Sequence, residues 1–101
     1  MSKIAIIAKL TAAEGKRDAL VEVLRAQIDL VADETGTEVY ALHTGDGDDT
    51  SVWFYEIYTD AAAAAAHSGS DAMKALGPKL AGLLAGRPEI IRCTPIKAKG
   101  L

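Results

Sequence analysis

Cysteine is almost absent from the 101-residue sequence, which contains only Cys93. A disulfide within the chain is therefore excluded, and the sequence lacks the cysteine framework of small secreted domains. This lack is typical of proteins in a reducing compartment, so a cytoplasmic location is predicted.

Motifs for metal ions and phosphate groups are also missing. The sequence contains two histidines, and no ligand-like spacing relates them to the cysteine, so a structural zinc site is not expected. The Gly- and Asp-rich segment 45–49 departs from a calcium loop, because Ser51 and Ile57 stand where that loop needs Gly and Glu. No Gly-rich phosphate loop joins a strand to a helix. The sequence therefore predicts neither a metal nor a cofactor.

Long charged and apolar runs are lacking as well. The formal net charge is −3, and Lys and Arg form no cluster, so no nucleic-acid partner is predicted. The apolar run 4–8 ends at Lys9, which makes it too short for a signal peptide or a membrane span. No membrane association is predicted.

Hydrophobic residues, in contrast, are plentiful. They make up 50% of a chain whose length suits one domain, predicted to span residues 1–101. A domain of this size has a small core and leaves much apolar surface uncovered. A second copy of the chain would cover that surplus, so a homodimer is predicted.

The first half of the sequence predicts three strands and one helix. The β-branched run 4–10 predicts a strand that is apolar on both faces. A helix with apolar residues every three or four positions follows, and it is expected to end at Gly36 in a left-handed conformation. Residues 37–44 and 51–59 predict the two strands of a hairpin joined by a polar turn.

The second half predicts an interrupted helix and a last strand. Asp60 is a good N-cap for the alanine run 61–66, and the Ser-Gly-Ser segment 68–70 should break the helix before it restarts. The Gly-Pro pair at 77–78 is expected to kink or divide the second part. Residues 88–96 predict the last strand.

The resulting order, β-α-β-β-α-β, is the split βαβ arrangement and predicts an α+β, ferredoxin-like fold. Its antiparallel four-stranded sheet would carry the helices on one face. Because strands 4–10 and 51–59 supply apolar side chains to both faces, the second face is expected to pack against a second copy.

Three polar residues stand among apolar neighbours. His67 ends the alanine helix, where it could interact with the helix C-terminus or act as a base at the mouth of a cavity. His43 is interpreted as a surface or interface residue, with a role at the site as the alternative. For Glu56, a salt bridge across strands or across the dimer, for example with Lys9 or Arg92, is favoured over a pocket carboxylate with a raised pKa.

Aromatic residues are few, so their positions are informative. Tyr40, Trp53, Tyr55 and Tyr58 alternate along the predicted hairpin. Core or interface packing is the usual role of such residues, but a phenol or indole can also line an apolar cavity and hold a polar group of a flat ligand.

Four stretches of the sequence resemble the antibiotic biosynthesis monooxygenase (ABM) family of dimeric α+β barrel proteins. They are residues 4–17 (IAIIAKLTAAEGKR), 34–43 (ETGTEVYALH), 55–60 (YEIYTD) and 64–67 (AAAH). The resemblance implies a homodimer with face-to-face sheets and a cavity between each sheet and its helices. It also implies oxidation of a small aromatic or quinol-type substrate by O₂ without metal or flavin, because the deprotonated substrate itself reduces oxygen.

The sequence also departs from the family. Tyr58 stands where the family has Trp after the strand glutamate. The haem-degrading branch needs an Asn on the first strand, where this sequence has Ala8 and Lys9, and an axial His, where it has Leu76 or Gly77. Haem degradation is therefore disfavoured. The candidate site residues are His67, Tyr58 and Tyr40 for catalysis and Trp53, Glu56 and His43 for substrate binding.

Three functions remain open on the sequence: a cofactor-independent monooxygenase, a small-ligand-binding dimer without catalysis, and an acid–base isomerase acting on a small metabolite. A cavity discriminates among them. An enzyme should have a pocket into which His67 and a tyrosine converge, whereas a structural dimer should fill that space with Leu and Ala side chains.

Overall fold

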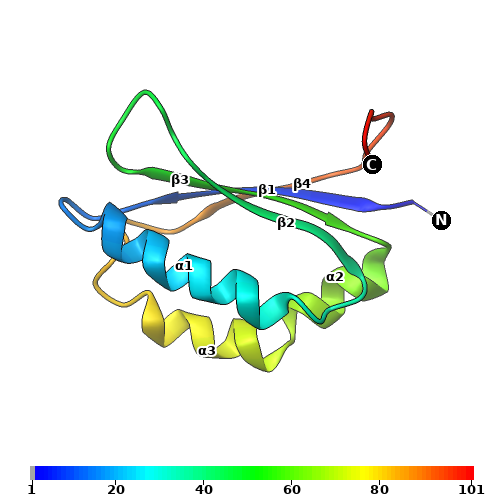
Figure 1. Cartoon of the computed structure of the whole chain (residues 1–101), viewed down its shortest axis with the longest axis horizontal. Coiled ribbons are helices and arrows are strands. Elements are labelled where there is room, and N and C mark those ends of the chain that lie inside the picture. The colour runs from blue at the N-terminus through cyan, green and yellow to red at the C-terminus, as the bar shows by residue number, and fades with distance from the viewer. Residues whose placement is uncertain (1) are drawn as a thin grey trace.

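A computed structural model describes residues 2–101 of the chain and confirms the predicted order of elements. The elements are β1 (Ile4–Thr11), α1 (Arg17–Val31), β2 (Thr37–Thr44), β3 (Ser51–Tyr58), α2 (Ala61–Ser68), α3 (Asp71–Lys79) and β4 (Glu89–Cys93). Figure 1 shows the helices together on one side of the sheet. No helix among the described residues combines the length and the hydrophobicity that crossing a membrane requires.

The sheet is antiparallel throughout, with strand order β2-β3-β1-β4. The central strand β1 pairs Ala8 with Phe54 of β3 on one side and with Ile90 of β4 on the other. This is the predicted ferredoxin-like arrangement, and it leaves one face of the sheet without helices.

The core lies between the sheet and α1. Leu20 and Leu24 of α1 are fully buried against Val52 and Phe54, which alternate on the helix-facing side of β3. Apolar side chains three and four residues apart on α1 thus pack in one cluster with side chains two residues apart on β3.

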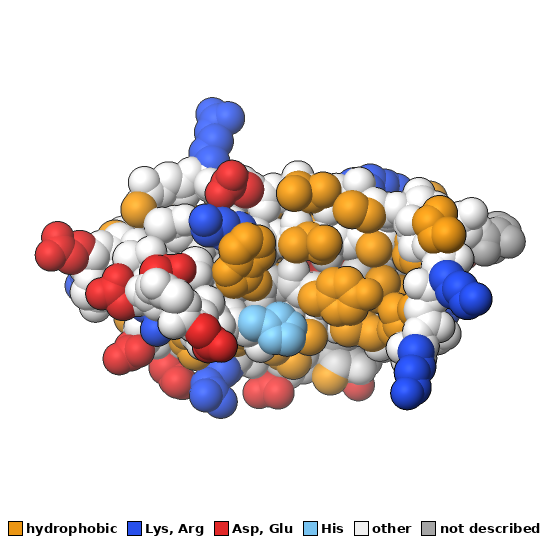
Figure 2. All heavy atoms as spheres, turned by 90° about the horizontal axis from the view of Figure 1, so that it is seen from above, with side chains coloured by type: hydrophobic (Ala, Val, Ile, Leu, Met, Phe, Trp, Pro, Cys, Tyr) orange, Lys and Arg blue, Asp and Glu red, His pale blue; other side chains and the backbone are white. Residues whose placement is uncertain are grey.

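The helix-free face of the sheet, here called the open face, is also apolar. Ile7, Trp53 and Ile91 lie on it around a shallow hollow. Figure 2 looks onto this face and shows hydrophobic side chains gathered over the strands. Near one end the chain after β4 covers part of it, since Pro95 and Ile96 line a pocket with the buried Ile57.

The interruption between α2 and α3 occurs where the sequence predicted it. The Asp60 carboxylate accepts a hydrogen bond of 2.8 Å from the Ala63 N–H and caps α2. Ser70 caps α3 by accepting from the Met73 N–H, and its hydroxyl donates to the His67 carbonyl at 2.8 Å. These bonds fix the end of α2, where His67 lies.

Gly36 has a different role from the one expected. Helix α1 already ends at Val31, and the described glycines with positive φ do not include Gly36. A Cβ atom at Gly36 would lie 2.4 Å from the Ala63 Cβ. Glycine is therefore needed here because the turn before β2 and helix α2 approach each other closely.

The boundaries of α3 and β4 also differ from the prediction. Pro78 lies within α3 rather than dividing it, and the helix ends one residue later, at Lys79. A proline is tolerated in the last turn because it removes only one helix hydrogen bond there. Strand β4 ends at Cys93 instead of residue 96, and Pro95 lacks the N–H that a longer ladder would need.

Candidate functional site

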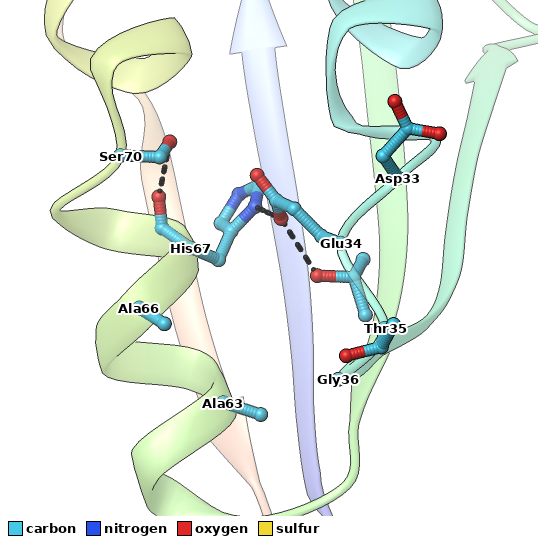
Figure 3. A pocket seen from close by; sticks show the side chains of 9 residues that line it. Asp33, Glu34, Thr35, Gly36, Ala63, Ala66, His67 and Ser70 are labelled. Atoms are coloured by element: carbon cyan, nitrogen blue, oxygen red, sulfur yellow. Dashed lines mark hydrogen bonds and ion pairs between the residues drawn. The ribbon is translucent and has the colours of Figure 1, made fainter.

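A pocket of about 400 Å³ lies between helix α2 and the turn that joins α1 to β2 (Figure 3). On the α2 side, Ala63 and Ala66 have small side chains that leave the space open. The whole pocket is lined by Asp33, Glu34, Thr35, Gly36, Thr37, Ala63, Ala66, His67 and Ser70.

His67 is the titratable group that α2 presents to this pocket. Its side chain is only 5% exposed, and its Nδ1 lies 2.7 Å from Oε1 of Glu34. The Thr37 hydroxyl donates to the same carboxylate oxygen at 2.8 Å, which fixes the orientation of Glu34 (Figure 3). Because an ionised carboxylate only accepts hydrogen bonds, Nδ1 is the donor in this contact, and Nε2 is the ring nitrogen that does not face Glu34.

Two tyrosines pack against the His67 ring from the sheet. The ring centroids of Tyr40 and His67 are 5.1 Å apart in an edge arrangement, and those of Tyr58 and His67 are 5.2 Å apart. Phe54 stacks on Tyr40 at 4.5 Å. Burial first, and the Glu56 carboxylate second, raise the pKa of both phenols above their ordinary value, so both stay protonated and can act only as neutral hydrogen-bonding groups.

Glu56 lies behind these rings, buried in β3 with 7% of its surface exposed. The Tyr58 hydroxyl donates to its Oε1. Burial raises the pKa of this carboxyl, while the bond from Tyr58 and the nearby His67 act in the opposite direction. The ion pairs found within residues 2–101 do not include Glu56, and Lys9 lies on the open face over Trp53, so the favoured salt bridge is not formed within one chain. The carboxyl has the raised pKa of the alternative, but it does not line the pocket.

The profile of the antibiotic biosynthesis monooxygenase family matches residues 3–78. The chain belongs to this ABM family. None of the curated proteins matches it.

Solved structures show the same fold over nearly the whole chain. A candidate ABM protein from Caulobacter crescentus is 26% identical, with a TM-score of 0.89 over 95% of this chain and 92% of that chain. PA3566 from Pseudomonas aeruginosa is 26% identical, with a TM-score of 0.87 over 96% and 97% of the two chains. NE2512 from Nitrosomonas europaea, a protein of unknown function, is 26% identical, with a TM-score of 0.86 over 98% and 94%.

The ABM fold separates two of the predicted site residues from His67. Trp53 lies on the open face of the sheet, with the Lys9 ammonium 5.4 Å from its ring centroid. His43 is opposite Trp53 in the β2–β3 register and is exposed. The structure thus brings together His67, Tyr40, Tyr58 and Glu56, and places Trp53 and His43 elsewhere.

Two residues of the interior were missed by the sequence analysis. Glu34 lies in one of the stretches that resemble the ABM family, but no local pattern shows that it meets a histidine 33 positions later. Gln27 is 1% exposed and interrupts the apolar stripe of α1 between Leu24 and Val31. A polar residue at a buried position of an amphipathic helix is visible in the sequence, and this signal could have identified Gln27 as an interior residue.

The ABM pocket contains no group of metal ligands. Within residues 2–101, His, Cys, Asp and Glu side chains nowhere gather in threes as a metal ion would require. The pocket offers one imidazole, two carboxylates, two hydroxyl-bearing threonines, one serine and small apolar walls. Such a set can bind a small uncharged molecule and move one of its protons.

The raised pKa of Glu56 predicts a pH dependence of stability. A carboxyl whose folded-state pKa exceeds its ordinary value of 4.5 binds more protons in the folded state. Its contribution is therefore fully present below 4.5 and is lost as pH rises from there through the folded-state value. Glu56→Gln should raise the free energy of unfolding at pH 7 by roughly 1 kcal/mol, and the gain should disappear in acid.

Denaturant unfolding between about pH 3.5 and 8 would measure this difference, because that range covers the titration of carboxyl groups. The exposed Glu14→Gln variant is the control and should show no such trend. The assignment would be contradicted if the unfolding free energy of Glu56→Gln, taken relative to that of the wild type, were lower at pH 7 than in acid.

Proposed function

We propose that this ABM protein is a cofactor-independent monooxygenase that oxidises a small aromatic or quinol-type substrate with O₂. The observation that carries the proposal is the His67–Glu34 pair at the wall of the pocket of about 400 Å³. A buried imidazole that is oriented through Nδ1 by a carboxylate is arranged as a general base.

The proposed chemistry needs only a proton acceptor and a substrate rich in electrons. The free Nε2 of His67 would take a proton from an acidic C–H or O–H group of the substrate, and Glu34 would stabilise the imidazolium that forms. For a substrate with a reactive CH₂ group, the electrons pass to O₂, one oxygen atom becomes the new carbonyl, and the other leaves as water. The substrate supplies all electrons, so the step balances without a further reductant.

The buried phenols support this role of His67. Tyr40 and Tyr58 contact its ring from the sheet side but do not line the pocket, so of the expected His67 and tyrosine only His67 reaches the pocket itself. They hold the imidazole in position and shield it from water, which strengthens its interaction with Glu34.

Oxygen consumption tests the proposal directly. Chelator-treated protein would be supplied with anthrones and hydroquinones while dissolved O₂ and the oxidised product are measured. Uptake above the rate without protein is the expected result. Exchange of a substrate proton with solvent deuterium without O₂ uptake would instead identify an acid–base isomerase, and binding without either reaction would identify a ligand-binding protein.

Glu34 offers a second prediction for the same site. Glu34→Gln keeps the size of the side chain but removes the charge that stabilises a protonated His67. The rate of oxygen uptake at saturating substrate should fall by roughly tenfold to a hundredfold, the loss that such supporting groups cause. Asp33→Asn, which also removes a carboxylate from the pocket wall, is the control. Equal effects of the two variants would contradict a specific role of Glu34.

The active form that we propose is a homodimer built through the open face. On this face Ile91 is 58% exposed and Tyr55 is 38% exposed in the single chain. Both follow the alternation that also places Ile7 and Trp53 on this face (Figure 2). An apolar sheet surface of this kind is unfavourable in water, and a second copy would cover it with a matching surface.

A further inference from the structure

The wall of the His67 pocket carries more negative charge than a single base requires. Asp33 and Glu34 both line it, and none of its lining residues is Lys or Arg. The ion pairs found within residues 2–101 give Glu34 only His67 as a partner and do not include Asp33. When the imidazole is neutral, the pocket therefore has an excess of negative charge.

Two helix ends add to this charge. Helix α1 ends at Val31, two residues before Asp33, and α2 ends at Ser68, directly after His67 (Figure 3). The C-terminal end of a helix carries a partial negative charge of about half an elementary charge. The last turn of α1 contains no basic residue that would compensate it. Both ends therefore favour a cation in the pocket between them.

The hydrogen-bonding groups of the pocket are mainly acceptors. The Thr37 hydroxyl donates to Oε1 of Glu34, and the Ser70 hydroxyl donates to the His67 carbonyl, so both hydroxyl protons are used within the protein. Glu34 accepts its two hydrogen bonds through Oε1. Its Oε2 has no partner within residues 2–101, and it is not one of the buried atoms that lack one. This oxygen is therefore accessible to a ligand that can donate a hydrogen bond.

We propose that the pocket takes an aromatic ligand with a protonated amino group, which donates to Oε2 of Glu34. The ring would lie against Ala63 and Ala66 on the α2 side, in a pocket of about 400 Å³ that has room for one ring and a short side chain. An uncharged ligand would contact the same wall but would leave the charge of Glu34 without a counter-charge. That this ligand is also the substrate that is oxidised rests on the proposed function; the preference for a cation rests on the pocket alone.

Three probes that share a phenol ring and differ in one group test this preference in the absence of O₂. Tyramine is a cation at about pH 7, tyrosol is its neutral hydroxyl analogue, and 4-hydroxyphenylacetate is an anion. In equilibrium dialysis at low salt, the wild type should bind tyramine about tenfold more tightly than tyrosol, as expected for a hydrogen bond to a charged group. The anion should bind more weakly than tyrosol, because the carboxylates repel it. Added NaCl should reduce the preference for tyramine by screening the charges.

A pair of charge variants tests the role of Glu34. Glu34→Gln should reduce the preference for tyramine over tyrosol to about threefold or less, because only the weaker attraction of the remaining charges is left. Asp29→Asn makes the same change in net charge at an exposed position of α1 that does not line the pocket, and it should keep the preference.

A pair of leucine variants tests where the probes bind. Ala66→Leu fills space at the pocket wall and should weaken the binding of both tyramine and tyrosol by about tenfold or more. Ala65→Leu places the same side chain at the preceding position of α2, which is exposed and does not line the pocket, and it should bind both probes as the wild type does.

Binding of tyramine by the wild type that is no tighter than that of tyrosol, including no binding of either, would overturn the proposal. So would an undiminished preference in Glu34→Gln, or equal losses in the two leucine variants. If Glu34→Gln does not fold, a preference that is unchanged by salt would overturn it instead. Failure of the oxygenase reaction is a separate result, since it would appear as absent O₂ uptake while the anaerobic preference for tyramine persisted.

Discussion

Replacing His67 by Ala is expected to lower the rate of oxygen uptake by roughly 10² to 10⁴-fold, the range that a general base contributes. The substitution removes the imidazole that the Glu34 carboxylate orients at 2.7 Å. Initial rates at saturating substrate would measure the loss. His43→Ala removes the other histidine from an exposed position and is the matched control; at a concentration where both variants sediment as the wild type does, it should keep the wild-type rate.

Stability must be measured alongside the rate. His67 is buried against Tyr40 and Tyr58, so its truncation should also cost about 1 to 3 kcal/mol of unfolding free energy through lost packing. Rates are therefore compared at a temperature where circular dichroism shows both variants folded. Folded His67→Ala protein that consumes O₂ at the wild-type rate would assign His67 to capping and packing of α2, and would remove the base from the proposed mechanism.

The fold was predictable because its signals are local. Asp60 before an alanine run marks a helix start whatever the tertiary structure, and it caps α2 as expected. The Ser-Gly-Ser segment 68–70 likewise marks the break, and its Ser70 caps α3. Gly36 shows the limit of this reasoning. A glycine after a helix usually adopts a left-handed conformation, but here it is needed because Ala63, 27 positions later in the chain, comes within van der Waals contact.

The site was predictable only in part, for the same reason. His67 stood out as a polar residue at a helix end, and the structure places it at a pocket. Its partner Glu34 comes from a turn that only the folded chain brings near α2. Glu56 was expected to form an ion pair because a charged carboxylate is costly in a buried strand. The structure meets that cost differently, through a raised pKa and a hydrogen bond from Tyr58.

Trp53 illustrates how the alternation of side chains along a strand decides which residues can lie near His67. In β3 the side chains of Phe54, Glu56 and Tyr58 point toward the helices, and Trp53 points to the open face. Strand alternation therefore excludes Trp53 from the interior that holds His67. A role for Trp53 is instead expected in the interface between two copies, where large aromatic residues are typical anchors.

The largest effect on assembly is expected from Ile91→Asp on that open face. In the proposed dimer, Ile91 would be buried against the partner, and a carboxylate there would lose its hydration, a cost that the Lys9 ammonium in the same hollow offsets only in part. The dissociation constant should rise by roughly a hundredfold or more, consistent with a cost of about 3 kcal/mol for burying a charge at the interface. Sedimentation velocity at micromolar concentration should then show monomers in place of dimers.

Leu30→Asp provides a matched control for this prediction. Leu30 on α1 is 53% exposed, close to the 58% of Ile91, but it lies on the helix side of the molecule. The variant should sediment as the wild type does. Because the open face supplies apolar area that the small core lacks, dimer and fold should be lost together on dilution. A wild-type chain that is monomeric and folded at nanomolar concentration, or a Leu30→Asp variant that dissociates while Ile91→Asp does not, would refute an obligate dimer through this face.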